Sequence, residues 1–245
     1  MIVNNKVIKN IGLEDIENMI EDAIGCSNNS SNSFDLKLIF DVNMQLREKI
    51  NNYRDERVQK FASENEDKYK IIFHAIPIDA FLRTRIDTAK VRSAFRYKKF
   101  FTGHFSHDFE GLYNNEGLFK KRLFRNGIFE AILVEYRPEE GGVNVNQSYN
   151  EFKKFVNESL DIYGELDISC PIVYFITFTN VKGRSMIEGP ILNDCERDVL
   201  NPTGVIIKDK DQVGIEVENI FVPIWNHFGY DEDYLFDVPE KEGNQ

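Results

Sequence analysis

The chain has 245 residues, of which 42% are hydrophobic and 13% aromatic, and its formal net charge is −11. This composition predicts a folded protein with a sizeable core and excludes an intrinsically unstructured chain. The negative charge also argues against a protein that binds nucleic acid over its whole surface, because phosphate contacts need Lys and Arg. The three cysteines are far apart and form no CxxC pair, so a zinc site is not expected. The sequence also has no phosphate-binding loop, and no cofactor is expected.

Three features of the sequence predict where the protein works. No apolar run approaches the roughly 20 residues that a membrane span needs. The N-terminus lacks the apolar core of a signal peptide. Three cysteines that form no close pair are typical of a reducing compartment. We therefore expect a cytoplasmic protein without membrane contact.

The first 66 residues are predicted to form a helical front piece. Residues 13–24 are predicted to form an amphipathic helix, with Leu13, Ile16 and Ile20 on one face. Each large side chain contributes about 1.5–3 kcal/mol when it is fully buried. This face is therefore expected to pack on the main domain or on a partner subunit.

A polar connection leads from this helix to a longer one. Residues 26–33 are rich in Ser and Asn and are expected to form a loop. Residues 34–40 alternate weakly, which leaves open a short strand or the start of the next element. Residues 42–62 have an apolar stripe at helical spacing among many charges, and this predicts a long helix.

Residues 67–233 are expected to form the main domain, centred on a three-stranded meander. The predicted strands are 103–113, 118–124 and 128–136. Asn126 and Gly127 stand between the last two strands, and Asn-Gly between apolar runs is a strong signal for a tight hairpin turn.

Further elements flank this meander. Residues 71–78 are almost continuously apolar, which predicts a strand buried on both faces. Residues 148–163 are predicted to be a helix that begins with a capping box of Ser148 and Glu151 and ends at Gly164.

The C-terminal third supplies the remaining elements. Strands are expected at 171–179 and 203–208, with one or two helical turns at 193–200 between them. A short helix is expected at 222–228, and an acidic tail at 234–245. The fold class predicted is α+β, with a mainly antiparallel sheet and flanking helices.

Positive charge is concentrated in residues 81–126, which hold eleven basic and four acidic residues. This segment is therefore +7, while the rest of the chain is −18. The charges are either solvated, or they form a surface for an acidic protein or for nucleic-acid phosphates. Phe95 and Tyr97, interleaved with the cations, would suit base stacking in the latter case. The candidate binding residues are Arg92, Arg96, Lys98, Lys99, Lys121 and Arg122.

No catalytic signature is strong enough to name a reaction. The weak candidates for a metal site are His104, His107 and Asp108, since imidazole and carboxylate groups are metal ligands. On a regular strand, however, His104 and His107 would point to opposite faces. No metal is therefore expected, although a metal-dependent nuclease is kept as the second alternative function.

Four segments in order resemble the C-terminal companion domain of bacterial Schlafen AlbA-type proteins, which carry a predicted DNA-binding or ATP-binding domain. The segments are residues 50–57, 72–81, 123–130 and 221–230. The AlbA-type domain itself would precede the charged helix, and only about forty residues do so here. Its nucleic-acid role is therefore not carried over to this chain.

Composition and resemblance together lead to one functional hypothesis. The chain is expected to be a non-catalytic interaction or regulatory module of a Schlafen-AlbA-like system, in phage defence or transcriptional control. A protein partner or a homo-oligomer is expected. The first alternative is a nucleic-acid-binding protein that uses residues 81–126.

Overall fold

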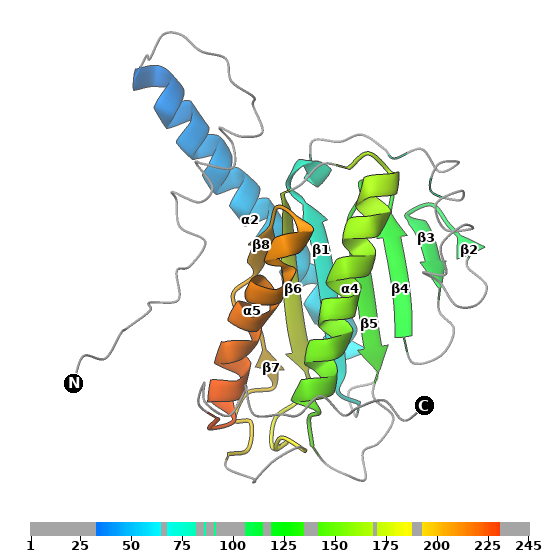
Figure 1. Ribbon diagram of the computed structural model, residues 1–245, viewed down its shortest axis with the longest axis vertical. Helices are drawn as coiled ribbons and strands as arrows, with labels where there is room; N and C mark the ends of the chain where they lie inside the picture. The colour runs from blue at the N-terminus through cyan, green and yellow to red at the C-terminus, as the bar shows by residue number, and fades with distance from the viewer. Residues whose placement is uncertain are drawn as a thin grey trace.

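The structure is a computed structural model, and for residues 33–43 only the backbone is described. The described ranges are 33–64, 68–81, 86, 91, 106–114, 119–134, 142–168, 171–187 and 193–230. They form a mainly antiparallel sheet with helices on both faces (Figure 1). The predicted α+β class is confirmed.

Within the described ranges the sheet has eight strands, and each strand runs antiparallel to the strands that it pairs with. The strands are β1 (Lys70–Pro77), β2 (Ser106–His107), β3 (Gly111–Asn114), β4 (Phe119–Phe124), β5 (Phe129–Val134), β6 (Ile172–Thr179), β7 (Val199–Leu200) and β8 (Val205–Ile207). Their order is β2-β3-β4-β5-β1-β6-β7, and β8 also pairs with β6. Strands β7 and β8 therefore share the outer edge of β6, at its two ends.

Strand β1 occupies the middle of the sheet. All eight of its residues are buried, as its continuous apolar sequence predicts. Pro77 ends the strand, where its missing N–H is tolerated. Because β5 and β6 both run antiparallel to β1, they run parallel to each other, and helix α4 (Val145–Glu165) connects them.

Alternate residues of β1 enter two different cores. Ile71 and Phe73 pack with helices α4 and α5 (Val213–His227) on one face of the sheet. Ile72 and Ile76 pack on the other face, against helix α2 (Ser33–Ser63). Figure 1 shows α4 and α5 in front of the sheet and the second half of α2 behind it.

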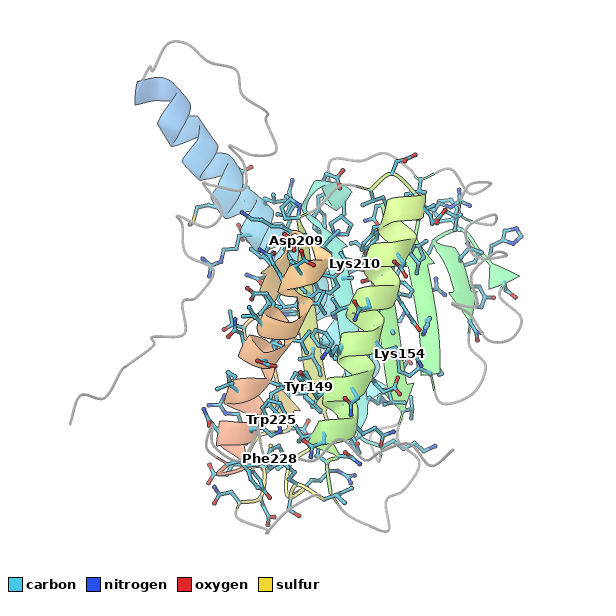
Figure 2. All side chains as sticks on the ribbon, in the orientation of Figure 1. Tyr149, Lys154, Asp209, Lys210, Trp225 and Phe228 are labelled. Carbon is cyan, nitrogen blue, oxygen red and sulfur yellow. The ribbon has the colours of Figure 1, made fainter. Side chains whose placement is uncertain are left out.

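Helices α4 and α5 are joined by aromatic packing. The ring of Tyr149 on α4 lies 5.6 Å from that of Trp225 on α5, and 5.3 Å from that of Phe221. Figure 2 shows Tyr149 and Trp225 between the two helices. This face of the sheet is therefore covered by the chain itself.

The meander is present but shorter than expected. Asn126 and Gly127 form the tight turn between β4 and β5, Gly127 has φ 94°, and Phe124 N–H bonds Ile128 O at 2.8 Å. The expected strand 103–113 is wrong as one element, because the chain folds back between β2 and β3. The Asp108 carboxylate accepts the N–H groups of the two residues at the β3 end of this turn, which fixes it.

Helix α4 differs from its prediction at both ends. It begins after Asn144, whose side chain caps the N–H of Gln147 at 2.8 Å. Ser148 instead donates its hydroxyl proton to Asn144 O inside the first turn, so the predicted capping box is wrong. Gly164 lies within the helix, and the left-handed residue after it is Asp167, with φ 55°.

The open choice for residues 34–40 is decided, because they form the start of α2. Two further expectations change. Residues 193–198 are irregular and contain no helix, and they lead into β7, where Val199 pairs with Thr179. Helix α5 starts nine residues earlier than expected, so Pro223 lies inside it. None of the described helices is long and apolar enough to cross a membrane.

Candidate functional site

Helix α2 has two halves with different surroundings. Its second half, from Ile50 onward, is the anchor, where Ile50, Val58 and Phe61 are buried against the sheet. Its first half, residues 33–49, is here called the arm. Between Met44 and Lys49, every side chain of the arm is exposed except that of Leu46, which is half-buried. Figure 1 shows the arm extending past the end of the sheet.

The C-terminal end of α2 is held by a buried lysine. Lys70, the first residue of β1, is only 2% exposed, and its Nζ donates to the carbonyl groups of Phe61 and Glu64. The last carbonyl groups of a helix lack partners within the helix, and they carry the negative end of its dipole. Lys70 therefore supplies both hydrogen bonds and compensating charge where α2 meets the sheet.

The middle of the anchor is fixed by a buried ion pair. Arg57 of α2 binds the Glu130 carboxylate of β5 in a bidentate manner, with Nε to Oε2 at 2.8 Å and Nη2 to Oε1 at 2.6 Å. The side chains are 13% and 2% exposed. The guanidinium also lies over the rings of Phe61 and Phe124, at 4.7 and 5.1 Å. This planar, stacked arrangement suits Arg rather than Lys.

Two further polar side chains complete this cluster. His74 of β1 stands opposite Glu130 in the strand register, and its Nε2 lies 3.3 Å from Oε2 of Glu130. Tyr53 of α2 packs edge-to-face on His74, Phe81 and Phe124. We call Tyr53, Arg57, His74 and Glu130 the anchor cluster.

The electrostatics of the anchor cluster keep Glu130 charged. Burial opposes ionisation, but the hydrogen bonds from Arg57 and the contact with His74 outweigh it, so the pKa of Glu130 lies below its ordinary value of 4.5. Burial and the charge of Glu130 raise the pKa of Tyr53 well above 10.0, so its hydroxyl stays protonated.

Histidine, glutamate and tyrosine are residue types used in acid–base catalysis. In this cluster, however, both oxygens of Glu130 are engaged by Arg57, and His74 is 0% exposed. A substrate in solvent therefore does not reach these groups. The ion pair and the ring contacts of this cluster hold α2 on the sheet.

The two described residues of the predicted basic surface point in different directions. Lys121 and Arg122 are neighbours on β4, so their side chains lie on opposite faces of the sheet. Lys121 pairs with Glu158 of α4 at 2.6 Å, and Arg122 pairs with Asp108 at 3.0 Å. Both cations are thus already balanced by carboxylates of the fold.

Four of the six predicted binding residues lie outside the described residues. They are Arg92, Arg96, Lys98 and Lys99. The basic surface therefore stays a prediction. The apolar face of Leu13, Ile16 and Ile20 also lies outside the described part of the chain.

The predicted metal ligands are only partly described. His104 lies outside the described residues, and His107 is exposed on β2. Asp108 serves the β2–β3 turn and pairs with Arg122. Burial opposes ionisation of Asp108, but the backbone hydrogen bond from Gly111 and the charge of Arg122 lower its pKa below the ordinary value. Among the residues that the structure describes, no group of three or more His, Cys, Asp or Glu side chains is arranged to hold a metal ion.

One close pair of reactive residue types was not predicted from the sequence. Cys195 Sγ lies 3.3 Å from Nε2 of His227, at the C-terminal end of α5, although 31 residues separate them in sequence. Cys195 is 1% exposed, and burial raises the pKa of its thiol. A neutral, buried thiol is a poor nucleophile. The contact joins the 193–198 segment to α5, and no local motif could have predicted it.

The anchor cluster is thus the best-defined arrangement of charged residues in the described part of the chain. Comparisons with protein-family models, with curated proteins and with solved structures find no match. The resemblance to the Schlafen AlbA-type companion domain therefore stays a prediction.

Proposed function

We propose that this chain is a non-catalytic interaction module, and that the arm of α2 is its contact element. The observation that carries the proposal is the contrast between the two halves of this helix. The anchor is fastened by a buried ion pair and a buried lysine, whereas the arm leaves the sheet as a continuous helix. A rigid mount of this kind presents the arm in a defined direction.

The sequence of the arm supports contact with a protein. Six of residues 33–42 are apolar, and the three acidic and three basic residues of 33–49 cancel. An isolated helix of this length is marginal in water, because helices gain most of their stability from packing an apolar face. A neutral, apolar arm suits a protein surface better than a polyanion, whose binding depends on Lys and Arg.

A regulatory role is consistent with an arm that is held in a fixed direction by the anchor. A protein that offers a fixed helix can bring a second protein to itself without chemistry of its own. This agrees with the module of a Schlafen-AlbA-like system that the sequence resemblance implies. The nucleic-acid alternative has weaker support, since the described cations of residues 81–126 that were candidates, Lys121 and Arg122, are paired within the fold.

Photo-crosslinking in the native host tests this function. Ile39 in the arm is replaced by p-benzoylphenylalanine, and Ile215, which is 65% exposed on α5, is replaced in a matched control. We expect the probe at position 39 to form a covalent adduct with one protein, identified by mass spectrometry, while the probe at position 215 does not. The same adduct pattern from both positions, or none from position 39, would contradict the proposal.

A further inference from the structure

The apolar stripe that docks α2 on the sheet continues into the arm. Ile50 and Tyr53 face the sheet, and half-buried Leu46 packs beside them. Positions 39 and 36 continue the same alternating spacing of three and four residues, with Asn43 between them and Leu46. Such a spacing is that of the core positions of a coiled coil.

We propose that a second copy of this chain covers this stripe, with the two arms packed antiparallel. This inference rests on the proposed function and names the partner. Parallel packing is excluded by the fold: the stripe faces the chain's own sheet from Ile50 onward, so a parallel second helix would run into that sheet. In an antiparallel pair the two sheets lie at opposite ends of the paired arms.

The arm has matching residue types for this arrangement. Pairing about position 41 places Leu36 of one copy beside Leu46 of the other, and Ile39 beside Asn43. The flanking positions 40 and 42 then meet their own counterparts, and they hold Phe and Val. Both flanks of the seam are therefore apolar in this register. Asn43 faces Ile39 in this register, and an Asn at a core position lowers the stability of a coiled coil.

Charge also favours this pairing. The arm is neutral, while the whole chain is −11, so close contact between two chains is least opposed along the arms. Antiparallel arms keep the acidic bodies apart. Residues 33–46 span only about 20 Å of helix, so the interface is small. Small interfaces give weak, transient complexes, and a concentration-dependent dimer is expected.

Sedimentation velocity of the full chain from about 1 to about 200 μM tests the dimer, because mass action populates a weak complex only at high concentration. We expect the wild type to shift from monomer to dimer. A variant with Leu36→Glu and Ile39→Glu should stay monomeric. The control with Gln45→Glu and Asn52→Glu adds the same charge at two exposed positions off the stripe and should dimerise like the wild type. Unchanged melting temperatures would show that all three chains remain folded.

Disulfide trapping in chains with Cys26→Ser and Cys170→Ser tests the orientation. In the antiparallel pair, Val42→Cys meets its own counterpart and should crosslink, whereas Leu36→Cys should not. Crosslinking by Leu36→Cys alone, or a wild type that is monomeric at every concentration, would overturn the inference. A monomeric wild type whose arm still binds another protein would overturn the inference but leave the proposed function standing. A monomeric wild type whose melting temperature falls when residues 1–25 are deleted would overturn it in favour of the chain's own N-terminal segment.

Discussion

Replacing Glu130 with Gln is expected to lower the free energy of unfolding by about 3–5 kcal/mol, because removing one partner of a buried ion pair leaves the other charge uncompensated. The Arg57 guanidinium would keep its buried position without a carboxylate, and His74 would lose its charged neighbour. Urea denaturation at neutral pH measures the change. Gln has nearly the shape of Glu, so packing is little altered.

Two further variants separate the ion pair from general effects of charge. Glu110→Gln removes a carboxylate that is 52% exposed and pairs with Arg122, and it should cost less than about 1 kcal/mol. Adding Arg57→Met to Glu130→Gln should restore part of the loss, because the uncompensated charge is then gone. A loss below 1 kcal/mol for Glu130→Gln alone would show that the pair does not fasten α2.

The effect of Glu130→Gln should depend on pH in a defined direction. The pKa of Glu130 is lower in the folded chain than its ordinary 4.5, so its contribution to stability is fully present above pH 4.5. The contribution is lost as the pH falls through the folded pKa. The difference between wild type and variant should therefore shrink below 4.5, and a difference that stays constant down to about pH 3 would contradict the ionised state of Glu130.

Replacing Lys70 with Met should lower the free energy of unfolding by about 2–3 kcal/mol, since hydrogen bonds to charged groups contribute about 1.5–3 kcal/mol. The Met side chain retains the apolar stem of Lys70 but cannot donate to the carbonyl groups of Phe61 and Glu64. We expect amide exchange in the last turn of α2 to accelerate by more than the global change explains, because those carbonyl groups lose their cap.

Lys60→Met is the matched control for this substitution. Lys60 lies in the last turn of α2, but its side chain is exposed. Surface changes of this kind are usually within about 0.5 kcal/mol. If both variants lost the same stability, the buried position of Lys70 would have no special role in holding the helix.

The sheet could be predicted largely from the sequence, because its strands carry local signals. The continuous apolar run of β1 and the Asn126-Gly127 turn have local physical causes, and the structure confirms both. The prediction of one continuous strand over residues 103–113 was wrong, because the hydrogen bonds of the Asp108 carboxylate allow the chain to reverse there. The predicted start of α4 was wrong, because Asn144 and not Ser148 caps the helix.

The anchor cluster was beyond prediction from the sequence. Arg57 and Glu130 are 73 residues apart, and each looks like one more charge among many. His74 is buried beside Glu130, although it lies within the otherwise apolar run of β1. What joins these residues is the β1–β5 register together with the docking of α2, and both are tertiary facts. A carboxylate near the start of the apolar strand β5 was a signal that a buried partner existed.

Hydrogen exchange of α2 tests the central claim most directly, since amides that are covered by a partner open less often. At about 1 μM the anchor amides of residues 50–63 should exchange slowly and the arm amides of residues 33–46 quickly. At about 200 μM the arm should become protected in the wild type but not in the Leu36→Glu, Ile39→Glu variant, while the anchor stays unchanged. Equal protection of the arm at both concentrations and in both chains would contradict the account that the arm is a contact surface mounted on a fixed anchor.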